Sequence, residues 1–298
     1  MRVLLLLSVG LRFVGAQTPT RTIAVTFDDL PIASHALENN VPAQRIVTKR
    51  LLDTLAAFQV PAIGFVNAGR FAPNGQMEPR RITVLQQWID AGLELGNHSY
   101  SHADFHETSL KAFSADVQYG DSLIRALLLA ARKPPPAWFR HPYLHTGRDS
   151  VTRARFEQGL AAHGYRVAPV TVNTDEYLYA SRYDRLAAHH DSAAMRKLAK
   201  EYVTYMTDVM GRCEQRSVEI FGREIPQIML LHANVLNADH FAELARMLVY
   251  RGYGFVPIAA AMEDSAYQRP DRYYGDEGLS WLGRWARDKK RIKPSTTP

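Results

Sequence analysis

Cysteine is almost absent from this chain of 298 residues, because Cys213 is its single thiol. No disulfide can form within the chain, so stability must come from a large buried core. No segment after residue 16 reaches the roughly 20 apolar residues of a membrane helix, and we expect no transmembrane segment. Strong charge of one sign is also lacking, since 36 basic residues face 30 acidic ones. This modest excess argues against nucleic acid as a partner.

The N-terminal residues 1–16 have the layout of a secretory signal peptide, with Arg2 ahead of an apolar run at residues 3–9 and small residues up to Ala16. A buried first strand is the alternative interpretation. Cleavage after Ala16 would remove Arg2 and Arg12 and lower the net charge from +6 to +4. We therefore expect an exported protein, either periplasmic or extracellular.

Short apolar runs alternate with amphipathic segments, which predicts βα units and a largely parallel sheet. The seven expected strands are residues 22–27, 61–66, 93–97, 137–140, 165–171, 227–232 and 253–256. The expected helices include residues 42–58, 80–90, 108–131, 149–162 and 238–250. Seven such units favour an α/β fold of the distorted (β/α) barrel type, closed or nearly closed. The long interval 172–226, with a helix expected at 191–210, is a candidate rim or lid.

Residues with catalytic chemistry follow the expected strands. In parallel barrels the carboxyl ends of the strands form the rim on which active sites are built. Each residue alone has an ordinary explanation, such as a helix cap or an ion pair. Their joint placement at one rim favours a functional site. The residues are Asp28, Asp29, His98, Arg140, Asn173, Glu176 and His232.

Two adjacent carboxylates, Asp28 and Asp29, repel each other unless a cation lies beside them. His98 and His102 are four residues apart, so that on a first helical turn both imidazoles would reach one ion. His102 with His106 is a competing pair. Asp29, His98 and His102 would leave coordination positions open, as in a catalytic site. Zinc is the default divalent ion, with cobalt, manganese, nickel or iron as alternatives.

Three further residues complete the expected site. Arg140 would keep Asp28 ionised and oriented. His-Pro-Tyr follows Arg140 and makes a rigid bend, from which the Tyr143 N–H would face a developing oxyanion. His232 ends an apolar strand and is suited to protonate a leaving amine.

Four motifs, TFDD at 26–29, HSYSH at 98–102, RHPY at 140–143 and LLH at 230–232, together resemble the polysaccharide deacetylase family, also called the NodB-homology domain or carbohydrate esterase family four. The resemblance spans roughly residues 22–260. It implies a distorted barrel of seven strands and removal of N-acetyl groups from sugars. It also implies that Asp28 is the general base, that Asp29, His98 and His102 bind the metal, and that His232 is the general acid.

A further motif, the fourth along the chain in the family, departs from the family pattern, because this chain reads VNTDEY at 172–177 where the family usually shows an Asp and then Asp-Trp. We align Asn173, Glu176 and Tyr177 with that motif, and Asp175 gives an alternative register. The resemblance implies that Glu176 tunes His232 and that Tyr177 walls the site. Asn173, Tyr177 and Tyr143 are thus expected to bind substrate, and Trp138 and Tyr179 are further candidates to stack on sugars.

We therefore predict three segments: a signal peptide at 1–16, a deacetylase catalytic domain at 17–265, and a C-terminal extension with a basic tail at 266–298. The expected partner is an acetylated glycan, which loses N-acetyl or O-acetyl groups. Two alternatives stay open: a hydrolase of a non-glycan amide or cyclic imide, and a carbohydrate-binding relative with impaired catalysis. The sequence leaves the oligomeric state unknown.

Overall fold

The computed structural model describes residues 19–292, so the expected signal peptide lies outside the described residues. All seven expected strands are present. They are β1 (Arg21–Leu30), β2 (Ile63–Val66), β3 (Glu94–Asn97), β4 (Trp138–Phe139), β5 (Arg166–Val167), β6 (Gln227–His232) and β7 (Tyr253–Phe255). Every pairing between them is parallel, and the expected α/β barrel class is confirmed.

The strands run in the order β5-β4-β3-β2-β1-β6, and β7 pairs with the beginning of β1. Beyond β5 the chain reaches β6 through a single parallel bridge between Val172 and Met229. The barrel is therefore distorted and closed only weakly at this seam. The sequence predicted a strand over 165–171, but regular pairing stops at Val167 and leaves a short, irregular segment beside β6.

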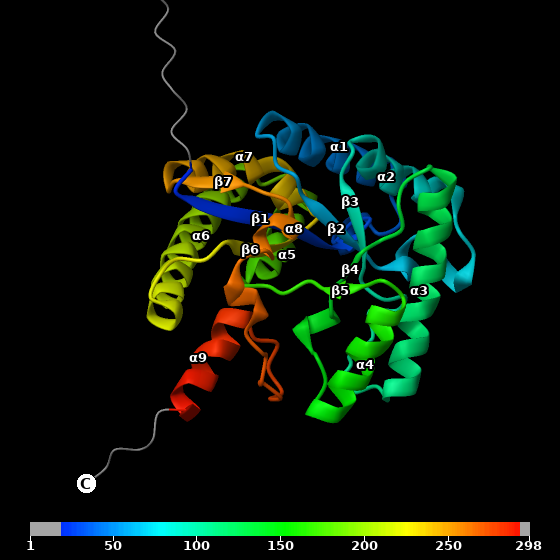
Figure 1. Cartoon of the computed structure of the whole chain (residues 1–298). Coiled ribbons are helices and arrows are strands. Elements are labelled where there is room, and N and C mark those ends of the chain that lie inside the picture. The colour runs from blue at the N-terminus through cyan, green and yellow to red at the C-terminus, as the bar shows by residue number, and fades with distance from the viewer. Residues whose placement is uncertain (1–18, 293–298) are drawn as a thin grey trace, which may run out of the picture.

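Helices surround this sheet (Figure 1). They are α1 (Val41–Ala57), α2 (Pro79–Asp90), α3 (Leu110–Ala130), α4 (Ser150–Ala162), α5 (Glu176–Ala188), α6 (Ser192–Phe221), α7 (Val235–Tyr250), α8 (Ile258–Ala261) and α9 (Trp281–Ile292). Helix α1 illustrates why they form. Asn40 caps its first turn by accepting from the Ala43 N–H, and Val47, Leu51 and Leu55 bury one stripe in the core. No helix of residues 19–292 is long and apolar enough to cross a membrane.

The long interval 172–226 contains two helices. Helix α6 is 30 residues long and ends at Gly222, whose left-handed conformation caps it. The shorter helix α5 packs against both α6 and α7. It was not expected from the sequence, and it begins at Glu176, next to the barrel rim.

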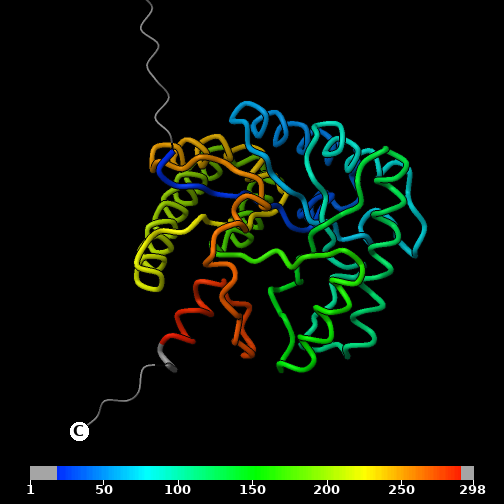
Figure 2. The backbone as a smooth tube through the Cα atoms, viewed as in Figure 1, coloured from blue at the N-terminus to red at the C-terminus, as the bar shows by residue number. Residues whose placement is uncertain are grey.

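The C-terminal extension is part of the fold over its described length. Trp281, Leu282 and Trp285 of α9 are buried in one hydrophobic cluster with Val170 and Leu230. The backbone tube in Figure 2 shows α9 beside α6 and below the barrel. The extension therefore contributes to the core and does not trail from it.

Candidate active site

Asp28 and Asp29 both lie at the rim because the end of β1 is irregular. Side chains normally alternate between the two faces of a strand. Here the pairing register with β2 shifts between Phe27 and Leu30, and Asp29 adopts a φ of 61°. Such left-handed backbone costs about 1–3 kcal/mol in a residue other than glycine. This local strain lets two consecutive carboxylates line the same cavity.

His98 and His102 lie in a loop, so the expected helical turn is wrong. The backbone of Ser99 has a φ of 67° and that of His102 a φ of 58°, both incompatible with a right-handed helix. Side chains stabilise the loop: Asn97 Oδ1 accepts from the Ser99 N–H, and Ser99 Oγ accepts from the His102 N–H. The two imidazoles nevertheless converge, with ring centroids 4.9 Å apart.

Asp29, His98 and His102 have ligand atoms that all lie within 4.8 Å of one another. Asp29 Oδ1 is 3.8 Å from His98 Nε2 and 3.5 Å from His102 Nε2. Burial lowers the pKa of each imidazole to about 4, so both are neutral at pH 7. Burial opposes ionisation of Asp29 as well, but the two imidazoles and Arg70 lower its pKa to about 2. One carboxylate and two neutral imidazoles form a donor set suited to a divalent ion.

A hydrogen bond at Nδ1 fixes the tautomer of His98. The His98 Nδ1–H donates a hydrogen bond of 2.8 Å to the backbone oxygen of Arg140. The Nε2 lone pair of His98 therefore faces Asp29 and the cavity. A backbone carbonyl in this role is a usual support for a metal-binding histidine.

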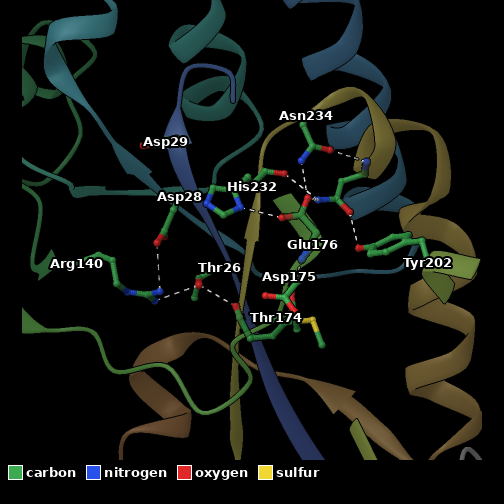
Figure 3. A network of polar contacts seen from close by, with 12 residues as sticks. Thr26, Asp28, Asp29, Arg140, Thr174, Asp175, Glu176, Tyr202, His232 and Asn234 are labelled. Atoms are coloured by element: carbon green, nitrogen blue, oxygen red, sulfur yellow. Dashed lines mark hydrogen bonds and ion pairs between the residues drawn. The ribbon is translucent and has the colours of Figure 1, made fainter. Parts of the chain in front are cut away.

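Asp28 is buried beside the fully buried Arg140, as Figure 3 shows. Arg140 Nη1 is 3.5 Å from Asp28 Oδ2, and Nη2 donates to Thr26 Oγ1 at 3.1 Å. Burial raises the pKa of Asp28, and the Arg140 charge opposes that rise. Asp28 Oδ1 is buried and has no hydrogen-bond partner among the described residues. An unpaired buried acceptor at this position is suited to take a proton from a reacting molecule.

His232 is held by a buried polar network at the end of β6 (Figure 3). His232 Nδ1 donates to Glu176 Oε2 at 2.8 Å. The other Glu176 oxygen accepts from the side-chain amides of Asn234 and Asn237. Burial alone would lower the pKa of His232, but the hydrogen bond and charge of Glu176 raise it to about 9. A protonated His232 is therefore the dominant form at neutral pH.

A cavity of about 1040 Å³ joins these groups, and helix α5 forms one of its walls. This position agrees with the rim or lid expected for residues 172–226. Tyr143 and Tyr177 line the cavity with more than half of their surfaces exposed, 55% and 53%. Asn173 also lines it and donates to the Gly278 oxygen of the C-terminal extension at 3.1 Å.

Two aromatic residues expected as sugar-stacking candidates have other surroundings. Trp138 is buried in the core with Arg166 over its ring. Tyr179 stacks on Tyr205, in the packing between α5 and α6. The alternative register of the fourth motif is also disfavoured, because Asp175 pairs with the Tyr205 hydroxyl and Glu176 faces His232.

Several residues of the site were not expected from the sequence. Arg70 Nη2 lies 3.4 Å from Asp29 Oδ2, and nothing in the sequence around Arg70 pointed to it. Asn234 and Asn237 hold Glu176, and the short spacing from His232 to Asn234 was an available signal. Thr26 lies within the TFDD motif, two residues before Asp28, and its Oγ1 accepts a hydrogen bond from Arg140.

A family model described as polysaccharide deacetylase matches residues 15–168, which is more than half of the chain. The chain belongs to the polysaccharide deacetylase family. The match includes Asp28, Asp29, His98, His102 and Arg140 and ends before Glu176 and His232. His232 lies beside Asp28 on the adjacent strand and is hydrogen-bonded to Glu176.

A curated protein is similar in sequence, and solved structures share the fold. A chitin deacetylase from Arthroderma benhamiae is 26% identical over 164 residues, which are 55% of this chain and 37% of that protein. The chain thus spans well under half the length of this relative. An acetyl xylan esterase of family 4 from Clostridium thermocellum, solved with a cobalt ion, shares the fold with a TM-score of 0.53 and 17% identity, over 84% of this chain and 97% of that one. A family pseudoenzyme from Bacillus anthracis has a TM-score of 0.51 and 16% identity, over 82% and 66% of the chains.

Proposed function

We propose that this deacetylase-family chain is a metal-dependent hydrolase that removes N-acetyl groups from a polysaccharide or oligosaccharide and releases acetate. The observation that carries the proposal is that an unpaired carboxylate oxygen and a protonated imidazole line the same cavity from adjacent strands. The unpaired acceptor Asp28 lies on β1, and the cationic His232 lies on the neighbouring strand β6. Hydrolysis of an amide needs both a proton acceptor for water and a proton donor for the departing nitrogen.

The metal requirement is supported by the donor set. Asp29 Oδ1 is buried without a hydrogen-bond partner among residues 19–292, although two neutral imidazoles face it. This oxygen is better satisfied by a cation than by two lone pairs. We propose that Asp29, His98 and His102 would hold the ion, with zinc as the default and cobalt, manganese, nickel or iron as alternatives. When bound, such an ion supplies Lewis acidity toward the acetyl carbonyl and toward water.

The chain's own residues then divide the proton transfers. Asp28 takes a proton from water as the water oxygen bonds to the acetyl carbon, and Arg140 keeps Asp28 oriented and ionised. The Tyr143 N–H donates to the oxygen that gains charge. His232 gives its proton to the nitrogen as the carbon–nitrogen bond breaks, and Glu176 stabilises the His232 cation. Water and the N-acetyl group are thus converted to acetate and a free amine.

The cavity favours a glycan as the substrate. Exposed tyrosines at positions 143 and 177 present faces on which sugar rings stack, and Asn173 adds a polar contact. An O-acetyl ester, a cyclic imide or another non-glycan amide would need the same proton transfers. Parallel measurement of acetate release from chitin oligomers, peptidoglycan and acetylated xylan separates these substrates. With residues 1–16 as a signal peptide, the substrate would lie in the periplasm or outside the cell.

Substitution of Asp28 by Asn tests the base. Asp28→Asn keeps the size of the side chain and leaves the three proposed ligands in place. We expect acetate release to fall by at least about 100-fold, because a positioned base contributes 10²–10⁴-fold. Zinc content, measured on the same protein, should stay unchanged.

The control is Asp175→Asn, which removes a neighbouring carboxylate that does not face the ion. Full activity of Asp28→Asn would reject the assigned base. A chain that binds glycan and zinc but releases no acetate from any of the three substrates would instead support the catalytically impaired relative.

A further inference from the structure

A second group of potential metal ligands lies outside the active-site cavity. Asp104 and His106 belong to the loop after β3, and His145 belongs to the loop after β4. Their ligand atoms all lie within 4.8 Å of one another. Asp104 Oδ1 is 2.7 Å from His145 Nδ1, and the three side chains are half-buried. We propose that Asp104, His106 and His145 form a second divalent-cation site that ties these two loops together.

The donors at this second site are incompletely satisfied. His106 Nδ1 is buried and has no hydrogen-bond partner among the described residues. The rings of His106 and His145 stack with centroids 4.0 Å apart and an angle of 5° between their planes. Stacking gains little for two imidazoles with no cation between them. Rotation of the two rings about their Cβ–Cγ bonds would let each present a nitrogen lone pair to an ion beside Asp104.

The charges around the second site favour a dication. Glu107 and Asp276 both pair with Arg148, whose Nε donates to the His106 oxygen. Asp104 is hydrogen-bonded to His145 and to the His106 N–H, so the group holds three carboxylates and one guanidinium, and the imidazoles are neutral when they bind a metal. The remaining charge of −2 is balanced by one divalent ion. Two imidazoles and a carboxylate are ligands that zinc accepts, with water in the open position.

The second site would support the catalytic loop. Tyr143 and Leu144, which precede His145, have φ values of 56° and 57°. Such backbone persists only where its surroundings enforce it. Tyr143 also lies between the two groups, with its ring 4.6 Å from that of His102 and 5.8 Å from that of His145. An ion at His145 would fix the loop that presents the Tyr143 N–H.

Zinc binding to the chelator-stripped protein tests the second site directly. Wild type should retain about two zinc ions per chain after gel filtration, and the His145→Gln and Asp104→Asn variants about one. Asn at position 104 still accepts from the His106 N–H, so this variant keeps the turn while losing the charge. The His98→Ala/His102→Ala double variant should also retain about one, and adding His145→Gln should remove it.

His189→Gln is the matched control, since His189 is an exposed histidine outside both groups and should leave the zinc content unchanged. Imidazole NMR signals of His106 and His145 should shift when zinc is added to the His98→Ala/His102→Ala variant. If wild type and His145→Gln bound equal zinc, and those signals did not move, the second site would be rejected while the first stood. If only the His98→Ala/His102→Ala variant retained as much zinc as wild type, the first site would be rejected and the second would stand.

Discussion

Replacement of Glu176 by Gln removes the only carboxylate of residues 19–292 that is hydrogen-bonded to His232 and keeps the size of the side chain. The surrounding side-chain amides make this exchange unfavourable. Asn237 Oδ1 accepts from the Tyr202 hydroxyl, and Asn234 Oδ1 accepts from the Asn237 N–H. Both side-chain NH₂ groups are therefore committed to donate toward Glu176. A Gln amide would have to direct its own NH₂ either at these donors or at His232.

The magnitude follows from the pKa of His232. Burial opposes protonation, and Glu176 nevertheless raises this pKa to about 9, compared with 6.5 for an unperturbed imidazole. Without the carboxylate charge, the pKa should fall to 6.5 or below, a change worth about 3.4 kcal/mol. Because the acid form donates the proton, activity is present below the pKa and lost as the pH rises through it. At pH 8 the protonated fraction should fall roughly 30-fold.

The assay is a pH profile of kcat for acetate release by wild type and Glu176→Gln. The alkaline limb should move from near pH 9 to pH 6.5 or lower, and the activity at acidic pH should recover part of the loss. Asp175→Asn is the control, because it removes the carboxylate that the alternative register would place beside His232. An unmoved alkaline limb in Glu176→Gln would refute our account of His232. A shift in Asp175→Asn alone would restore the alternative register.

Two further variants test the surroundings of the site. Arg70→Ala should strengthen zinc binding at Asp29 by up to about fivefold, because a partly exposed cation near the ion is removed. Competition with a chromophoric chelator measures the zinc affinity. Weaker zinc binding would mean that Arg70 orients Asp29. Arg284→Ala should lower the free energy of unfolding by about 3 kcal/mol in a denaturant titration, since Asp271 and the Leu144 oxygen lose a buried donor. An unchanged midpoint would contradict that role for Arg284.

Strand positions were predictable where a strand is buried on both faces, as β2 and β6 are. β6 agrees with its expected range of 227–232 and is buried along nearly its whole length. The length of β5 was overestimated. Residues 168–172 are as apolar as a strand, but their hydrogen bonds to β6 across the seam are irregular. Apolar composition reports burial, and it does not report whether a neighbouring strand continues far enough to pair.

The residues of the candidate site were largely predictable from their position after strands, but their local backbone was not. The spacing of His98 and His102 suggested a helical turn, and hydrogen bonds from Asn97 and Ser99 produce a loop with positive φ instead. Arg70 was missed because it reaches Asp29 from a short 3₁₀ turn, Ala68–Arg70, that carries no motif. Contacts made across the barrel leave no pattern along the chain.

Strained backbone is concentrated at the candidate site. Nine residues other than glycine have positive φ in the described part of the chain, and Asp29, Ser99, His102, Tyr143 and Leu144 are five of them. All five lie at the end of β1 or in the loops after β3 and β4, the segments that carry the proposed ligands and the proposed oxyanion donor. Each such conformation costs about 1–3 kcal/mol, so the surrounding contacts must offset it. Arg284 does so for the Leu144 loop from the C-terminal extension, beyond the residues that match the family model. The extension is therefore coupled to the geometry of the site, and its removal should disturb catalysis as well as stability.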